Sequence, residues 1–223
     1  MRFTRGFILA VAATVCLVRL ADDASAQEGD KFRKYESDYY VIHSDLPIET
    51  VREAHARMTA VAEEYHRRTK GFAGRIRRKF PFYFYGSSAD YYAAGGVRGS
   101  AGMYNGRVLM ARADKRMGDY VWKVLQHEAW HQFMHVVVRG KVPIWVNEGL
   151  AEYFGEGVWT GDGLTTGVIP PERLKKVKKM IDDGKVVDFL DMLEMSGNDW
   201  SRGLSKRKYD QAWSMCHFLI HAD

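Results

Sequence analysis

Cysteine is scarce in this sequence. Only Cys16 and Cys216 occur among the 223 residues, and we expect Cys16 to be removed with the N-terminal segment described below. An internal disulfide is then excluded, although an oxidising compartment would permit one. Cys216 falls in an apolar helical pattern with Trp213, Leu219 and Ile220, which predicts a buried thiol.

Long apolar runs are missing as well. The run from Phe7 to Val18 is shorter than the roughly 20 residues of a membrane-spanning helix, and no other segment is long and apolar enough to span. It follows Arg2 and Arg5 and precedes Ala24–Ala26, an order typical of a secretory signal peptide over residues 1–26. We expect cleavage after Ala26 and export to the periplasm or the extracellular space. The alternative is an uncleaved membrane anchor.

Internal repeats and low-complexity linkers are also absent. Hydrophobic residues make up 46% of the chain and aromatic residues 13%, which excludes a disordered composition. Residues 27–223 are therefore predicted to form one α+β domain. The last helical pattern carries no stop signal before Asp223, so we expect that the natural chain can continue further.

The charge pattern contains no nucleic-acid-binding motif. The formal net charge is +5, with basic clusters at residues 75–79, 173–179 and 206–208. Such clusters can bind nucleic acid or an anionic envelope. The favoured interpretation is that they cover solvated surfaces, as the lysines of residues 173–179 would on an amphipathic helix.

Hydrophobic periodicity predicts the elements around the motifs. Strands are expected over residues 39–44, 80–86 and 107–111, and helices over 49–69, from about 118, and from about 145. Asn105-Gly106 suits a hairpin turn because both positions tolerate a positive φ. Asp119 is a candidate N-cap for the second helix, and Ser87 or Ser88 for a short helix after the second strand.

The helix expected from about residue 118 contains "HEAWH", which fits H-E-x-x-H. Because residues four apart share one helix face, His127 and His131 can converge on one tetrahedral zinc ion. Glu128 then points beside the ion, where it can accept a proton from water as a general base. The alternative is a solvated helix with incidental histidines, but the flanking residues are apolar. His135 lies about 12 Å along the axis from His127 and cannot readily join them.

A third ligand is expected from another segment. Glu148 follows His131 by seventeen residues, in a helix that can fold back antiparallel beyond a Gly-Lys-Val-Pro turn. Gly149 is expected to let the two helices approach closely. Glu152 shares the face of Glu148 and is placed to accept the second N–H of a ligand histidine. The histidines elsewhere (His43, His55, His66, His217, His221) are predicted not to be ligands.

The combination "HEAWHQF…PIWVNEGLAEYF" resembles the gluzincin metallopeptidases. It looks most like a secreted bacterial peptidase-MA-like group catalogued as a domain of unknown function, DUF1570. The specific part spans Trp122–Phe154, and a weaker likeness covers nearly all of the mature chain. The resemblance implies one zinc ion on His127, His131 and Glu148, with Glu128 as general base.

The resemblance also implies a zincin-like α+β fold. It has a small, mostly antiparallel sheet packed on the H-E-x-x-H helix, and a mostly helical C-terminal half. An edge strand before that helix would pair with extended peptide, and the matching residues here are Val108, Leu109, Met110 and Ala111. In related enzymes a downstream tyrosine or histidine stabilises the oxyanion, and Tyr209 is the candidate, with His217 and Tyr153 as alternatives.

Three hypotheses about function follow from these residues. The first is an exported zinc metallopeptidase that acts on a peptide or protein substrate. The second is a non-catalytic envelope or scaffold module with a structural zinc. Structural zinc usually has four protein ligands, often thiolates, so three ligands without cysteine favour an open position and the enzyme. The third, a basic nucleic-acid binder, has no motif in support, and no nucleic-acid partner is expected.

Overall fold

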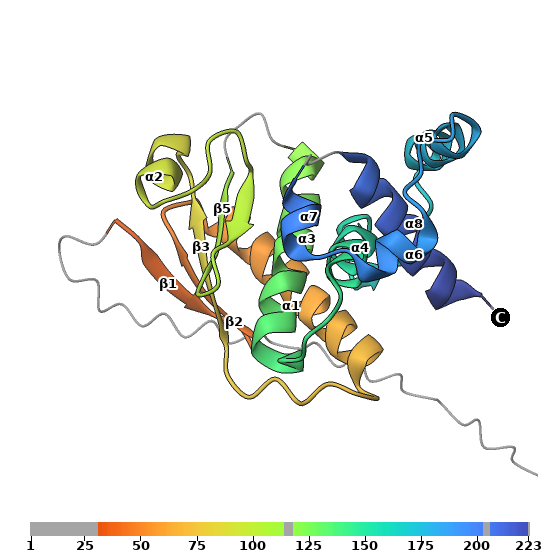
Figure 1. Cartoon of the computed structure of the whole chain (residues 1–223). Helices are drawn as coiled ribbons and strands as arrows, with labels where there is room; N and C mark the ends of the chain where they lie inside the picture. Colours follow the sequence, from red (N-terminus) through yellow and green to blue (C-terminus); the bar gives the residue numbers. More distant parts are fainter. Residues whose placement is uncertain (1–30, 114–117, 203–205, 223) are drawn as a thin grey trace, which may run out of the picture.

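The computed structural model describes residues 31–113, 118–202 and 206–222. The predicted signal peptide, residues 1–26, and Cys16 lie outside these ranges. Within them, none of the helices combines the length and the apolar character that a membrane span requires. Figure 1 shows a sheet on one side of helix α3 and a group of helices on its other side.

The sheet has five strands in the order β1-β2-β3-β5-β4. Their bounds are β1 Arg33–Glu36, β2 Tyr40–Ser44, β3 Phe80–Tyr85, β4 Gly102–Tyr104 and β5 Leu109–Arg112. The outer pairs β1–β2 and β4–β5 are antiparallel, whereas β2–β3 and β3–β5 are parallel. The sheet is therefore mixed, and the expectation of a mostly antiparallel one is wrong. The long helix α1 (Ile48–Thr69) connects β2 to β3, and a crossover of that length makes the two strands parallel.

The predicted edge strand is also corrected. Leu109, Met110 and Ala111 belong to β5, which lies inside the sheet between β3 and β4. All three are buried, because β5 is covered on both faces, while Val108 lies in the hairpin loop. The hairpin turn is present but shifted by one residue: Gly106 lies at φ 86°, whereas the N–H of Asn105 donates to the carbonyl of Val108, so Gly106 and Arg107 are the turn residues. The free edge beside α3 belongs to the first hairpin strand, β4.

One face of the sheet packs on helices α1 and α3 (Gly118–Phe133), and the other is partly covered by α2 (Ser88–Ala93). Alternation along β3 explains the two layers: Phe80, Phe82 and Phe84 face α1 and α3, and Tyr85 packs with Tyr91 of α2. Ser87 caps α2 by accepting the N–H groups of residues 89 and 90, as predicted. Asp119 is not a cap, since it lies inside the first turn of α3.

Helix α3 does not end as a regular α-helix. Residues Met134–Val138 form a π-helical segment, η1, and Arg139 follows at φ 56°, where its N–H donates to the carbonyl of Met134. A π-helix carries more residues per turn than an α-helix, so it changes the direction in which later side chains point. The chain then turns through residues 139–143 into α4 (Ile144–Gly155).

The C-terminal half is mostly helical. After α4 come a small hairpin of β6 (Val158–Trp159) and β7 (Leu164–Thr165), then α5 (Pro171–Asp182), α6 (Phe189–Glu194), α7 (Gly197–Ser201) and α8 (Lys206–His221). Helix α4 lies between α3 and α8 (Figure 1). Cys216 of α8 is buried, as predicted, and burial raises the pKa of its thiol to about 12.

The close approach at Gly149 is to a different helix than the sequence suggested. A Cβ atom there would lie 2.5 Å from the carbonyl oxygen of Ala212 and 2.6 Å from the sulfur of Cys216, both in α8. The glycine that faces α3 is Gly155, at 3.3 Å from the carbonyl oxygen of Lys123. Gly149 therefore sets the α4–α8 crossing, and Gly155 contributes to the α3–α4 packing.

Candidate metal centre

Three potential ligand atoms converge between α3 and α4. The Nε2 atoms of His127 and His131 are 3.1 Å apart, and Oε2 of Glu148 lies 3.6 Å and 3.5 Å from them. Ligands at 2.0–2.1 Å in a tetrahedron are separated by about 3.3–3.4 Å. The observed triangle fits that spacing. Two histidines and one carboxylate also form a known ligand set for zinc with one position left open.

The local sequence explains why these side chains meet. His127 and His131 are one turn apart on α3, so their rings extend from the same face. Pro143 precedes α4, whose first turn is anchored by the buried ring of Trp145 against Met192 and Trp200. This anchoring fixes the helix that carries Glu148 on the open side of the two imidazoles. The three side chains are 14–18% exposed, so solvent can still reach the centre.

Each histidine has a second partner. Oε1 of Glu152 lies 3.3 Å from Nδ1 of His127, on the ring edge opposite the triad. Oδ1 of Asn147 lies 3.4 Å from Nδ1 of His131. Such contacts fix the orientation of the ring and leave Nε2 directed at the centre.

Behind Glu152 lies a partly buried arginine. The guanidinium of Arg173, on α5, donates to Glu152 and also lies 3.3 Å from Glu156 and 2.9 Å from Asp210. It stands over the ring of Trp213. This one side chain links α4, α5 and α8, and it supplies the counter-charge for a carboxylate that touches His127.

The electrostatics of the site follow from its burial. Desolvation alone would lower the pKa of His127, but contacts with Glu148 and Glu152 outweigh it and raise the pKa to about 10. Desolvation would likewise raise the pKa of Glu148, yet His127 and His131 hold it at about 2. Each charge is thus stabilised by opposite charges that the fold has brought together.

Glu128 lies at the edge of the sheet rather than in the triad. Its Oε2 accepts the backbone N–H of Tyr104 at 2.7 Å, so this N–H of β4 faces away from β5. The contact fixes the carboxylate between the free strand edge and the histidines. One carboxylate oxygen is therefore committed to β4, and the other is left to act on a substrate or on water.

The ring of Tyr209, on α8, lies next to the ring of His127, and their centroids are 6.5 Å apart. Burial, together with the negative charges of Glu148, Glu152 and Glu128, raises the pKa of its hydroxyl. The phenol therefore stays protonated at neutral pH and keeps a hydrogen to donate.

The alternatives to Tyr209 have other partners. The Tyr153 hydroxyl lies 3.0 Å from Nε2 of His221, and Nε2 of His217 lies 3.1 Å from the carbonyl oxygen of Gly167. These two side chains, with His221, form a ring cluster between α4 and α8. Neither is directed at the triad.

The remaining histidines occupy separate positions. Nδ1 of His135 lies 2.7 Å from the hydroxyl of Tyr104, within the π-helical segment and outside the triad. His43 stacks on Tyr83 of β3. His55 and His66 belong to α1. Among the described residues, His127, His131 and Glu148 are the one group whose side chains could hold a metal ion together.

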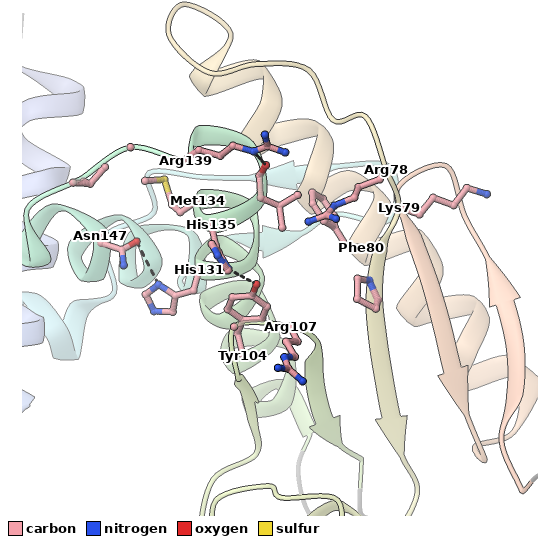
Figure 2. Close-up of a pocket in the computed structure, with 15 residues that line it drawn as sticks. Arg78, Lys79, Phe80, Tyr104, Arg107, His131, Met134, His135, Arg139 and Asn147 are labelled. Atoms are coloured by element: carbon pink, nitrogen blue, oxygen red, sulfur yellow. Dashed lines mark hydrogen bonds between the residues drawn. The ribbon is translucent and has the colours of Figure 1, made fainter.

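A cleft opens from the centre along the C-terminal part of α3. It has a volume of about 960 Å³ and begins at His131 and Asn147. Figure 2 shows these two side chains on one side of it, with Tyr104 and His135 beside them and arginines around the rim. The cleft is lined by polar and apolar residues from β3, the β4–β5 hairpin, α3, η1, the chain leading into α4, and α4 itself.

Two of the side chains that complete the site were not expected from sequence. Asn147 and Arg173 are polar residues that no spacing rule connects to the histidines. Tyr104 acts through its backbone N–H, which no residue type reveals. The adjacency of Asn147 to Glu148 is the one signal in the sequence that favoured a role at the centre.

Comparison with known proteins gives one similarity. The family model described as a protein of unknown function (DUF1570) matches residues 123–223, a little under half of the chain, and this segment contains His127, His131 and Glu148. No curated protein and no solved structure matches the chain. The family description names no activity, so the chemistry has to be argued from the site itself.

Proposed function

We propose that this protein is a zinc-dependent metallopeptidase that hydrolyses peptide bonds. The observation that supports this most is the triangle of Nε2, Nε2 and Oε2 atoms, with sides of 3.1, 3.5 and 3.6 Å. Its donor set and spacing suit one zinc ion per chain on His127, His131 and Glu148. Zinc would supply Lewis-acid chemistry at this place, activating water and polarising the peptide carbonyl.

Glu128 is assigned as the general base. Its Oε2 accepts the Tyr104 N–H, which leaves Oε1 to take a proton from the attacking water and later to pass it to the leaving amine. Glu152 and Asn147 would accept the Nδ1–H groups of the two imidazoles when zinc is bound, which would leave each Nε2 to bind the ion. Tyr209 is assigned as the donor to the oxyanion, since its phenol stays protonated and its ring lies next to that of His127.

Substrate binding is assigned to β4 in place of the strand at Val108–Ala111. An extended peptide can pair with the outer edge of β4 through the backbone groups beside the Tyr104 N–H, which Glu128 already accepts. The peptide then lies across the open position of the zinc site. The N-terminal pattern at residues 1–26 supports a place for the enzyme outside the cytoplasm, in the periplasm or beyond the cell.

The test compares the wild type with Glu128→Gln. Zinc is quantified by elemental analysis, and both proteins digest a broad peptide library that is read by mass spectrometry. We expect about one zinc per chain in both proteins, and loss of hydrolysis by 100-fold or more in the variant, since general-base catalysis is worth about 10²–10⁴. Glutamine retains an oxygen for the Tyr104 N–H, so the geometry is kept. Undiminished hydrolysis in the variant would refute the mechanism.

A further inference from the structure

The cleft beside the metal centre carries a one-sided charge. The residues that line it include Arg78, Arg107 and Arg139, and within the described part of the chain no carboxylate lines it. The three arginines come from different segments: the residue pair before β3, the β4–β5 hairpin, and the end of η1. Segments separated in sequence therefore bring three cations to one concave surface (Figure 2).

Several other cations of the fold are held by ion pairs. Arg57, Arg67 and Arg68 form ion pairs with glutamates of α1. Lys79 also lines the cleft, but its ammonium lies 2.7 Å from Glu36 of β1. In the described ranges, no ion pair joins Arg78, Arg107 or Arg139 to an acid. Their charges are left to act on whatever enters the cleft.

The acids at the metal end do not line this cleft. The carboxylate of Glu128 is bonded to the backbone of β4, and that of Glu148 faces two imidazoles. Partly exposed apolar residues also line the cleft, among them Pro81, Val136 and Val142. Apolar surface next to basic side chains suits a side chain with a short aliphatic stem and a carboxylate head, which a guanidinium binds with two hydrogen bonds.

The position of the cleft fixes where such a side chain would sit. His131 belongs both to the triad and to the cleft, and His135 is one helical turn further, about 6 Å along the axis. An extended peptide advances about 3.3 Å per residue, so the part of the cleft level with His135 lies roughly two residues from the bond at the metal. The cleft lies at the C-terminal end of β4. A peptide antiparallel to β4 therefore places its residues N-terminal to the scissile bond there.

We propose that the cleft selects acidic peptide segments, with aspartate or glutamate about two residues N-terminal to the scissile bond. This substrate class rests on the proposed peptidase function. An extended peptide is favoured over nucleic acid as the anion because the cleft continues from a free strand edge. Its one lining tyrosine, Tyr104, donates to or accepts from His135, so it is not free to stack on a base.

A binding experiment tests the inference without requiring turnover. Zinc-loaded Glu128→Gln is titrated with fluorescein-labelled decapeptides that differ only in a central pair of residues, Glu-Glu, Gln-Gln or Lys-Lys, and fluorescence anisotropy is measured. We expect the Glu-Glu peptide to bind at least tenfold more tightly than Gln-Gln. When the protein also carries Arg78→Gln and Arg107→Gln, the ratio of the two affinities should fall about tenfold. Each lost charged contact is expected to weaken binding of the Glu-Glu peptide roughly three- to fivefold.

The matched control is Arg52→Gln, which removes an exposed arginine from α1, away from the cleft, and should change binding less than twofold. Equal affinity for Glu-Glu and Gln-Gln would overturn the inference. So would an acid preference that survives the double variant, or tighter binding of a single-stranded oligonucleotide of the same charge.

The same peptides, made as quenched substrates, separate this inference from the proposed function. Hydrolysis by the wild type with kcat/KM highest for acids N-terminal to the cut supports both. Hydrolysis without that preference, or with the preference on the C-terminal side alone, overturns the inference and keeps the peptidase. Selective binding of the acidic peptide without hydrolysis of any sequence keeps the inference and overturns the peptidase.

Discussion

Replacing Gly149 by alanine should destabilise the protein, because this residue sets the crossing of α4 and α8. An added Cβ would lie 2.5 Å from the carbonyl oxygen of Ala212, whereas ordinary contact begins at 3.4 Å, so the helices must separate by about 0.9 Å locally. Overpacking of this kind costs about 1–3 kcal/mol, and the better helix propensity of alanine returns up to about 1 kcal/mol. The expected net loss is about 1–2 kcal/mol.

Thermal unfolding measures this loss. For a domain of this size, each 1 kcal/mol lowers Tm by about 2–4 °C, so Tm should fall by roughly 2–8 °C. Gly197→Ala is the control, since Gly197 also lies in a helix but has open space around its Cβ position. Gly149 is adjacent to Glu148, so zinc affinity, measured by competition with a chromophoric chelator, should fall as well. A Gly149→Ala protein as stable as Gly197→Ala would refute the assigned packing.

Three further outcomes are expected. His131→Ala should abolish stoichiometric zinc binding in elemental analysis, whereas His135→Ala should retain it; equal loss in both would contradict the ligand assignment. Arg173→Gln should lower the free energy of unfolding by about 3 kcal/mol in urea denaturation, because Glu152 and its neighbours lose their buried counter-charge, and Arg173→Lys should recover part of it. Cys216 should resist alkylation at pH 8 until the protein unfolds. Since burial raises its pKa from 9.0 to about 12, its contribution to stability is complete below pH 9 and is lost as the pH rises towards 12; rapid alkylation of the native protein would contradict this.

The placement of His127, His131 and Glu148 was accessible from sequence because it depends on local geometry and one chain reversal. Helical spacing puts two histidines on one face, and a proline-containing turn brings the next helix back. The order of the strands depended on long-range pairing and was not accessible in the same way. A signal was present, however: the unbroken apolar run of Val108 to Ala111 is typical of a strand covered on both faces, not of an edge.

Arg173 shows a different limit of sequence reasoning. It stands in a lysine-rich helix whose neighbours Lys175, Lys176 and Lys178 are exposed, and nothing in the local pattern distinguishes it from them. Its burial arises because α5 packs on α8 at a point where three carboxylates from α4 and α8 converge. Gly149 presents the same difficulty, since a helical glycine predicts a close approach without naming the partner.

The π-helical segment Met134–Val138 lies between the histidines of α3 and Glu148 of α4. Its length should therefore matter more to the metal centre than its amino-acid composition. Deleting one residue there would restore the α-helical period and swing everything downstream by about 100° around the axis. The following helix would then deliver its carboxylate to the wrong side of the imidazoles. Substitutions within this segment should therefore be tolerated far better than single insertions or deletions, so the segment acts as a spacer of fixed length between His131 and Glu148.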